Sequence, residues 1–177
     1  VQDLIRLAKE KKDEFFFGSA GVGTAPHLSG ELFNMMAGVK MVHVAYRGNS
    51  QGLLDLVSGR LGAIFAPAPT LAAFVQDSRV KALALTTAKR SQQYPNLPTL
   101  DESGLKGFDT SIWYGFLAPK GTPPAIVKTL SDALVEAGQA ADVQTQLQRN
   151  GSERLVITGD EIDWAVERIG EVLWSYR

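Results

Sequence analysis

The sequence predicts an α/β fold with a largely parallel sheet, and three observations lead to this prediction. Short β-rich apolar segments alternate with amphipathic segments along the first half of the chain. The links between these segments are short, as they are in α/β units. Glycine-bearing loops follow the first two predicted strands, at the place where open α/β sheets commonly bind ligands. The 177 residues suffice for one domain with a substantial core or for two small ones.

The first half opens with an amphipathic helix that carries lysines near its C-terminal end, where cations suit the helix dipole. Thr24 is a suitable N-cap for a helix over residues 25–37, and Leu28, Leu32 and Met35 mark one apolar face of that helix. The pattern predicts strands at 15–19, 41–46, 62–66 and 80–87, and further helices at 52–59 and 69–77.

In the second half the pattern changes. Residues 91–109 are rich in turn formers, and such long irregular segments are usually functional or connecting. We then expect a strand at 111–119, helices at 121–134 and 140–149, a strand at 153–157, and a last helix opened by a capping box of Thr158 and Glu161. In the first of these helices Thr122 is the expected N-cap, and Ile126, Leu130 and Leu134 form the expected buried stripe.

Composition excludes several classes of function. The net charge of −1 gives no basic face for nucleic acid, and no run of 18 apolar residues is present. Cysteine is absent, which rules out disulfides, thiolate nucleophiles and cysteine-based zinc sites. Because the chain has only two histidines, we do not expect a histidine-rich metal site. The Gly-x-Ser-x-Gly elbow of hydrolases does not occur. We therefore expect no enzymatic activity, no metal and no cofactor.

The glycine loop at 18–24 is the first candidate site. Helix N-termini offer unpaired N–H groups and a partial positive charge, and Ser19 and Thr24 add hydroxyls. The loop lacks the third glycine of a dinucleotide fingerprint and the Gly-Lys-Ser/Thr of a P-loop. It is either an anion or carboxylate site or a structural turn. His27, at the third helical position, is either turned toward the loop or a structural histidine.

The segment 46–52 repeats this arrangement of strand, glycine-bearing loop and helix start. Two such loops after neighbouring strands could face one cleft, in which case Arg47 would supply a charge. The alternative is that Arg47 is a solvated loop cation. The third predicted strand ends at Ala66 and is followed by apolar residues, so that wall of a cleft would be uncharged.

Three stretches, at 17–61, 80–109 and 113–127, closely resemble the TctC/Bug family, the extracytoplasmic solute receptors of tripartite tricarboxylate transporters. The resemblance implies a type II periplasmic-binding-protein fold, with two α/β lobes and a cleft between them. Residues 1–110 would be the second ligand-binding lobe, with a mostly parallel sheet. Residues 111–177 would be the returning C-terminal part of the first lobe. We expect the rest of the first lobe and a signal peptide upstream, and a periplasmic location.

The resemblance also implies the ligand contacts. The expected contact residues are Ser19, Gly21, Val22, Gly23, Thr24, His27, Tyr46, Arg47, Gly48 and Ala66. A carboxylate only accepts hydrogen bonds, so backbone N–H groups and hydroxyls satisfy it. Many family members carry an aspartate where this chain has Ala66, and the departure argues against an amino-acid ligand.

The expected partners are a small carboxylate and the membrane subunits of a tripartite tricarboxylate transporter. An alternative is the effector-binding domain of a cytosolic transcription regulator, which would need a DNA-binding segment upstream. Deaminases on this architecture need a cofactor-bearing cysteine, which the chain lacks. Because apolar helix faces in the second half would lack cover, we also expect this chain to self-associate, as a two-fold dimer.

Overall fold

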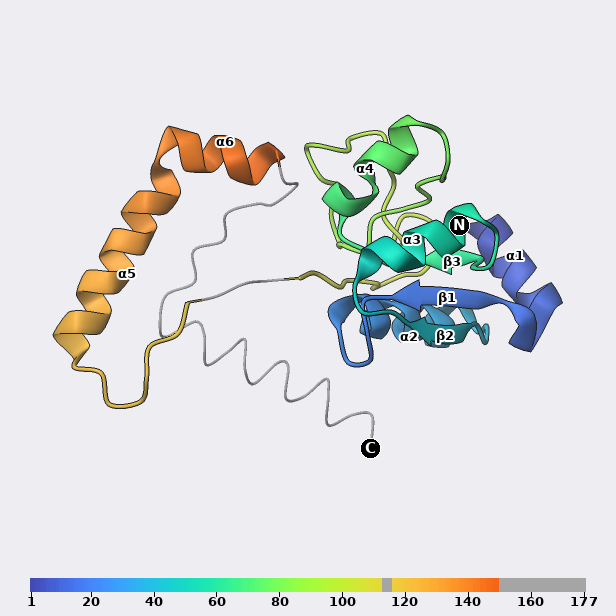
Figure 1. Cartoon of the computed structure of the whole chain (residues 1–177), viewed down its shortest axis with the longest axis horizontal. Helices are drawn as coiled ribbons and strands as arrows, with labels where there is room; N and C mark the ends of the chain where they lie inside the picture. The colour runs from blue at the N-terminus through green and yellow to red at the C-terminus, as the bar shows by residue number, and fades with distance from the viewer. Residues whose placement is uncertain (113–115, 150–177) are drawn as a thin grey trace. The chain divides into compact units, whose positions relative to one another are not determined.

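The computed structural model describes residues 1–112 and 116–149, and the chain divides into two compact units, Val1–Tyr114 and Gly115–Arg177 (Figure 1). The expected lobe boundary after residue 110 lies close to this division. That each unit belongs to a different receptor lobe stays a prediction.

The first unit is an α/β unit built on a parallel sheet. In chain order its elements are α1 (Gln2–Lys11), a 3₁₀ turn (Lys12–Glu14), β1 (Phe16–Ser19), α2 (Ala25–Ala37), β2 (Val42–Ala45), α3 (Asn49–Val57), β3 (Ala63–Ile64) and α4 (Ala68–Gln76). The three strands lie in the order β2-β1-β3, and β1 pairs in parallel with both neighbours. The expected parallel α/β fold is present.

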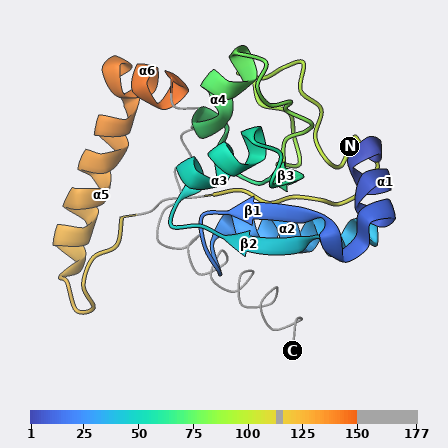
Figure 2. The same cartoon turned by 45° about the vertical axis from the view of Figure 1, so that its right-hand side comes forward.

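Helices α2 and α3 cover opposite faces of this sheet (Figures 1 and 2). On one face the ring of Phe17 is fully buried and lies so close to Gly30 of α2 that a Cβ there would be 2.1 Å from the ring. On the other face, Gly52 of α3 lies against Ile64 and Tyr46. Since side chains alternate along a strand, the Phe17 side carries α2 and the opposite side carries α3.

The buried face of α2 differs from the expected one. Leu28 and Met35 are 47% and 58% exposed, whereas Ser29, Gly30 and Phe33 are buried. The prediction followed the largest apolar side chains. The helix instead turns its small residues to the sheet, because the missing side chain at Gly30 makes room for the ring of Phe17.

The expected strand at 80–87 does not form. Leu85 makes one isolated parallel bridge with Thr99. The Leu85 N–H donates to the Pro98 carbonyl at 2.8 Å, and the Leu100 N–H donates to the Leu85 carbonyl at 2.9 Å. Pro98 has no N–H to continue the ladder, so the pairing ends after one bridge.

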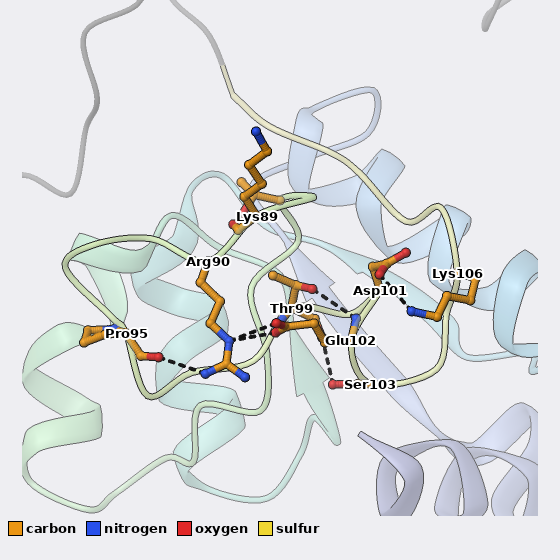
Figure 3. Close-up of polar contacts among 9 residues, drawn as sticks. Lys89, Arg90, Pro95, Thr99, Asp101, Glu102, Ser103 and Lys106 are labelled. Atoms are coloured by element: carbon orange, nitrogen blue, oxygen red, sulfur yellow. Dashed lines mark hydrogen bonds and ion pairs between the residues drawn. The ribbon is translucent and has the colours of Figure 1, made fainter.

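The irregular segment 91–109 is closed by a network of polar contacts (Figure 3). The Thr99 N–H donates to a Glu102 carboxylate oxygen at 2.8 Å, and the Glu102 N–H donates to the Thr99 hydroxyl at 3.1 Å, which is the reciprocal pattern of a capping box. Arg90 Nε donates to both oxygens of Glu102, at 3.0 and 2.8 Å, and its Nη1 donates to the Pro95 carbonyl. The Thr99 N–H and then Arg90 lower the pKa of Glu102.

The same segment supplies part of the core. The buried core residues come from α1, β1, α2, the residues just before β1 and β2, and this segment; they are Ala8, Phe15, Phe17, Phe33, Met41, Leu100, Leu105 and Phe108. Because Phe108 is fully buried, residues 91–109 are an integral part of the unit and not a loose connection.

In the second unit, α5 (Pro124–Gln139) and α6 (Ala141–Arg149) form near the expected ranges. The N-cap of α5 is Pro123 and not Thr122, whose hydroxyl donates to the Pro119 carbonyl at 2.8 Å. The expected buried stripe on α5 is exposed: its members are Ile126 at 51%, Leu130 at 51% and Leu134 at 41%. The three residues share a face as the spacing predicted, but no described residue buries that face.

Several expectations fall outside the described residues. These are the strand at 153–157, the last helix with Thr158 and Glu161, and residues 113–115 of the expected strand at 111–119. The described flanks of that strand, residues 111–112 and 116–119, are irregular.

Candidate functional site

Three loops follow β1, β2 and β3 at the carboxyl edge of the sheet: the first loop (residues 20–24), the second loop (46–48) and the third loop (65–67). Backbone hydrogen bonds tie the strand ends together: the Tyr46 N–H donates to the Ser19 carbonyl at 3.1 Å, and the Phe65 N–H to the Gly18 carbonyl at 3.3 Å. Because α2 and α3 cover opposite faces, the β1–β3 boundary is a topological switch point, where α/β sheets bind ligands.

The first loop uses several of its polar groups on itself. The Gly21 N–H donates to Ser19 Oγ at 3.1 Å, and the Gly23 N–H donates to His27 Nδ1 at 3.1 Å. The Thr24 hydroxyl donates to the Gly21 carbonyl at 2.7 Å, and the Thr24 N–H approaches the same oxygen at 3.4 Å. A hydroxyl has one proton to give, so in this conformation Thr24 Oγ1 has none left for a ligand.

Other donors at the same place stay uncommitted. The first intrahelical bond of α2 runs from the Leu28 N–H to the Thr24 carbonyl at 3.0 Å. Within the described residues, no hydrogen bond engages the N–H groups of Val22, Ala25 or His27. Unpaired N–H groups of this kind at a helix start favour an anion.

Ser19, at the end of β1, is fully buried and connects the first loop to β2. Its Oγ lies 2.7 Å from His43 Nε2 and donates to the Gly21 carbonyl at 3.1 Å. The ring of His43 lies between those of Phe17, at 5.0 Å between centroids, and His27, at 4.1 Å.

Burial, and next the neighbouring His27, lower the pKa of His43, while Glu31 acts in the opposite direction. Sequence reasoning did not place His43 in the site. The residue is paired with Phe17 in the β1–β2 register, and α2 covers that face of the sheet, so only the tertiary structure reveals that its ring lies beside that of His27.

The second loop is built differently. The Tyr46 hydroxyl donates to Asp55 of α3 at 2.8 Å, and Asp55 also pairs with Arg60 at 3.0 Å. Burial and the bond to Asp55 raise the pKa of Tyr46 to about 12. Arg47 is exposed and makes no ion pair with any described residue. Gly48 is the N-cap of α3 with φ 125°, a conformation that favours glycine.

Two further features complete the site. The Oδ1 atom of Asn49, at the start of α3, is buried and has no hydrogen-bond partner among the described residues. Such an atom calls for a partner that the chain does not supply. Asn49 was not among the expected contacts. Ala66, in the third loop, is partly buried and brings no charge, as expected.

A surface hollow of about 360 Å³ lies elsewhere, at the C-terminal end of α2. It is lined by Ala8, Lys9, Lys12, Asp13, Gly38, Val39 and Lys40. Lysines at this place complement the C-terminal dipoles of α1 and α2, so the hollow has a structural explanation. The described residues contain no cluster of three or more metal-ligating side chains, and none of their helices is long and apolar enough to cross a bilayer.

Solved structures with related sequences share the fold. An R. palustris protein solved with adipate superposes with a TM-score of 0.85 at 33% identity, over 95% of this chain and 56% of that one. The periplasmic binding protein BugD gives 0.75 at 32% identity, over 88% of this chain and 52% of that one. MatC from Rhodopseudomonas palustris, solved with bound malate, superposes with a TM-score of 0.74 at 28% identity, over 85% of this chain and 51% of that one. The expected periplasmic-binding-protein fold is confirmed.

Curated relatives agree. The "UPF0065 protein in tcbD-tcbE intergenic region" of Pseudomonas sp. strain P51 is 37% identical over 152 residues, which cover 85% of this chain and 45% of that protein. Protein BugT of Bordetella pertussis is 30% identical, over 89% of this chain and 48% of its own length. The chain thus spans about half the length of these relatives. The model of the tripartite tricarboxylate transporter family receptor matches residues 1–165, and the chain belongs to this family, known as TctC/Bug.

Proposed function

We propose that the protein is an extracytoplasmic receptor that captures a small carboxylate at the three loops and delivers it to the membrane subunits of a tripartite tricarboxylate transporter. Family membership supports this proposal, as do the two related structures solved with adipate and malate. The same match favours a receptor in the periplasm over an enzyme or the effector domain of a transcription regulator. The observation that carries the proposal is the group of uncommitted N–H donors at the start of α2.

The chemistry of the loops fits an anionic ligand. A carboxylate accepts several hydrogen bonds without bringing a donor, and the N–H groups of Val22, Ala25 and His27 are available to donate. Arg47 follows the adjacent strand and has no carboxylate partner among the described residues. An arginine in that state can form charge-assisted hydrogen bonds with a ligand carboxylate.

Calorimetry on the full-length protein with malate and with adipate tests the proposal. We expect at least one of these acids to bind, and we expect Arg47→Ala to weaken binding by about 10-fold to 100-fold, the usual effect of losing a hydrogen bond between charged groups. Lys9→Ala, which removes a cation from the hollow at the other end of α2, is the matched control and should bind normally. An unchanged affinity in Arg47→Ala would remove Arg47 from the site, and a protein that binds neither acid would contradict the proposal.

The nature of the ligand can be narrowed further. Ala66 places no carboxylate in the third loop, so the ammonium of an amino acid would be poorly compensated there. We expect glutarate to bind more tightly than glutamate, which has the same carbon chain with an added amino group. The opposite order would show that an acidic group elsewhere in the protein receives the ammonium.

Self-association of the 177-residue chain stays a separate prediction. Its motivation is the exposed apolar set that includes Phe116 and Leu117, each 82% exposed, and the α5 face carrying Ile126 and Leu130. Light scattering at tens of micromolar should give the mass of a dimer. A monodisperse monomer would contradict this prediction and leave the proposed ligand unaffected.

A further inference from the structure

The hydrogen bond from Gly23 to His27 defines the protonation state of that ring. The Gly23 N–H donates to His27 Nδ1 at 3.1 Å, so Nδ1 carries no proton in this conformation. A neutral imidazole then has its proton on Nε2, and this atom lies 3.9 Å from a Glu31 carboxylate oxygen. A second proton can therefore bind only to Nδ1, the atom that accepts the hydrogen bond from the Gly23 N–H.

The neighbouring ring of His43 allows only one of the two histidines, His27 or His43, to become positively charged. The centroids of His27 and His43 are 4.1 Å apart, and two imidazolium charges at that distance repel each other strongly. The proton belongs on His27, because Glu31 of α2 faces its Nε2 atom, whereas His43 of β2 lies between two rings beside the buried Ser19. Glu31 and His43 are the titratable groups that face His27, and the β1 residues in contact with the pair, Phe17 and Ser19, carry no charge.

Protonation and the closed loop exclude each other. A proton on Nδ1 turns that atom from an acceptor into a donor, and two donors cannot face each other, so the ring has to leave the Gly23 N–H. The first loop then offers two further donors, the Gly23 N–H and the imidazolium, beside the free N–H groups of α2.

We propose that His27, with His43 beside it, is a proton-operated latch on the first loop: one proton from solvent on Nδ1 of His27 releases the Gly23 N–H and converts the loop into a stronger anion site. A bound anion favours the protonated ring, so binding takes up a proton from solvent. By linkage, affinity for an anionic ligand should rise as the pH falls, by no more than tenfold for each pH unit because one proton is taken up. This second consequence rests on the proposed carboxylate ligand, whereas the latch itself does not.

Nuclear magnetic resonance on the full-length protein without ligand tests the latch. At pH 8 the imidazole nitrogens of His27 should show the Nε2–H tautomer. As the pH is lowered from 8 to 5, the Gly23 amide resonance should move with the same midpoint as the His27 ring. The matched control, His43→Phe, keeps a ring beside His27 without a second titrating group, and its Gly23 resonance should still move. A Gly23 amide that stays constant while His27 titrates would overturn the proposal.

Calorimetry with malate and adipate at pH 6, 7 and 8 tests the consequence for binding, in two buffers with different ionisation enthalpies. Wild type should take up a proton and bind more tightly at pH 6, whereas His27→Gln, which can still accept from Gly23 but takes no proton, should bind equally at all three. Equal wild-type affinity at pH 6 and 8 would overturn the coupling to ligand binding. A protein that binds neither acid would contradict the proposed function and not the latch, which the Gly23 titration decides separately.

Discussion

The first and second loops share one sequence pattern, a strand followed by a glycine-bearing loop and a helix, yet they close in different ways. In the first loop Ser19, Thr24 and His27 bond to backbone groups a few residues away. In the second loop the Tyr46 hydroxyl reaches Asp55 in α3, and Arg47 remains exposed. Ser19 and Thr24 are short polar side chains, which bond to nearby backbone, whereas the Tyr46 side chain extends away from its loop to α3.

The two loops therefore differ in what they can contribute to a ligand site. The first loop presents backbone donors in a geometry that its own side chains hold, with Ser19 fully buried beneath it. The second loop presents a charge on a flexible side chain, Arg47. Pre-organised donors and a mobile cation are complementary means of binding a carboxylate, and each can be altered separately.

The largest difference in stability between the two regions should appear when the helices that follow the loops, α2 and α3, are altered. A Cβ at Gly30 of α2 would lie 2.1 Å from the buried ring of Phe17, whereas a Cβ at Gly52 of α3 would lie 3.0 Å from Ile64 and 3.1 Å from Tyr46. We expect Gly30→Ala to lower the free energy of unfolding by about 1–3 kcal/mol through overpacking. Gly52→Ala should change it by less than about 1 kcal/mol, because helix propensity offsets the tighter contact.

Urea denaturation of both variants measures this difference. If Gly30→Ala is as stable as Gly52→Ala, then Phe17 has another position available and the close contact does not determine how α2 lies on the sheet.

The next largest effect on stability concerns Ser19, which forms hydrogen bonds within the first loop, and Arg47, which carries the charge of the second loop. Ser19→Ala leaves the Gly21 N–H and His43 Nε2 without a buried partner and should cost about 1–3 kcal/mol of stability. Arg47→Ala, its counterpart in the second loop, should change stability by less than about 0.5 kcal/mol, because the side chain is exposed. Thermal unfolding of the two variants decides whether the loops differ in this way; equal losses would contradict the comparison.

A third effect belongs to the second loop and depends on pH. The pKa of Tyr46 is raised to about 12 from its usual value of about 10. Because the folded state holds the phenol proton more tightly than the unfolded state, this contribution to stability is complete below pH 10 and is lost as the pH rises through 12.

Stability measured from pH 9 to 12 in wild type and Tyr46→Phe tests this effect. The wild-type protein should lose more stability than the variant across that range. Parallel curves for the two proteins would show that burial and the bond to Asp55 do not raise the pKa of Tyr46 in solution.

Within the first loop, the loss of Thr24 should have a smaller effect than the loss of Ser19. Thr24→Val removes the hydroxyl that donates to the Gly21 carbonyl and should cost about 0.5–1.5 kcal/mol of stability, the usual worth of one hydrogen bond. Its effect on carboxylate affinity should be smaller than that of Arg47→Ala, because the Thr24 proton is used within the loop. A loss of affinity in Thr24→Val that equals the loss in Arg47→Ala would show that Thr24 turns to the ligand on binding.

Local signals in the sequence were sufficient to predict where most elements lie. Helix α2 runs over Ala25–Ala37 as expected, because Thr24 and Pro26 mark its start and Gly38, with φ 61°, ends it. The parallel sheet and the loops at its carboxyl edge were also predictable, since hydrophobic period and glycine position depend on neighbours along the chain. For the same reason Ser19, Gly23, Thr24 and His27 were recognised as one candidate loop.

Tertiary structure decided what each element touches. The contact between Gly30 and Phe17 determines the buried face of α2, and Pro98 ends the pairing of Leu85. The strand register brings His43 beside Phe17, and the packing of α2 on that face brings it beside His27. Such contacts join residues distant in sequence, and their energies depend on shape and on hydrogen-bond partners that no local pattern encodes. The sequence by itself therefore determined where the loops lie, whereas only packing decided which of their donors are free.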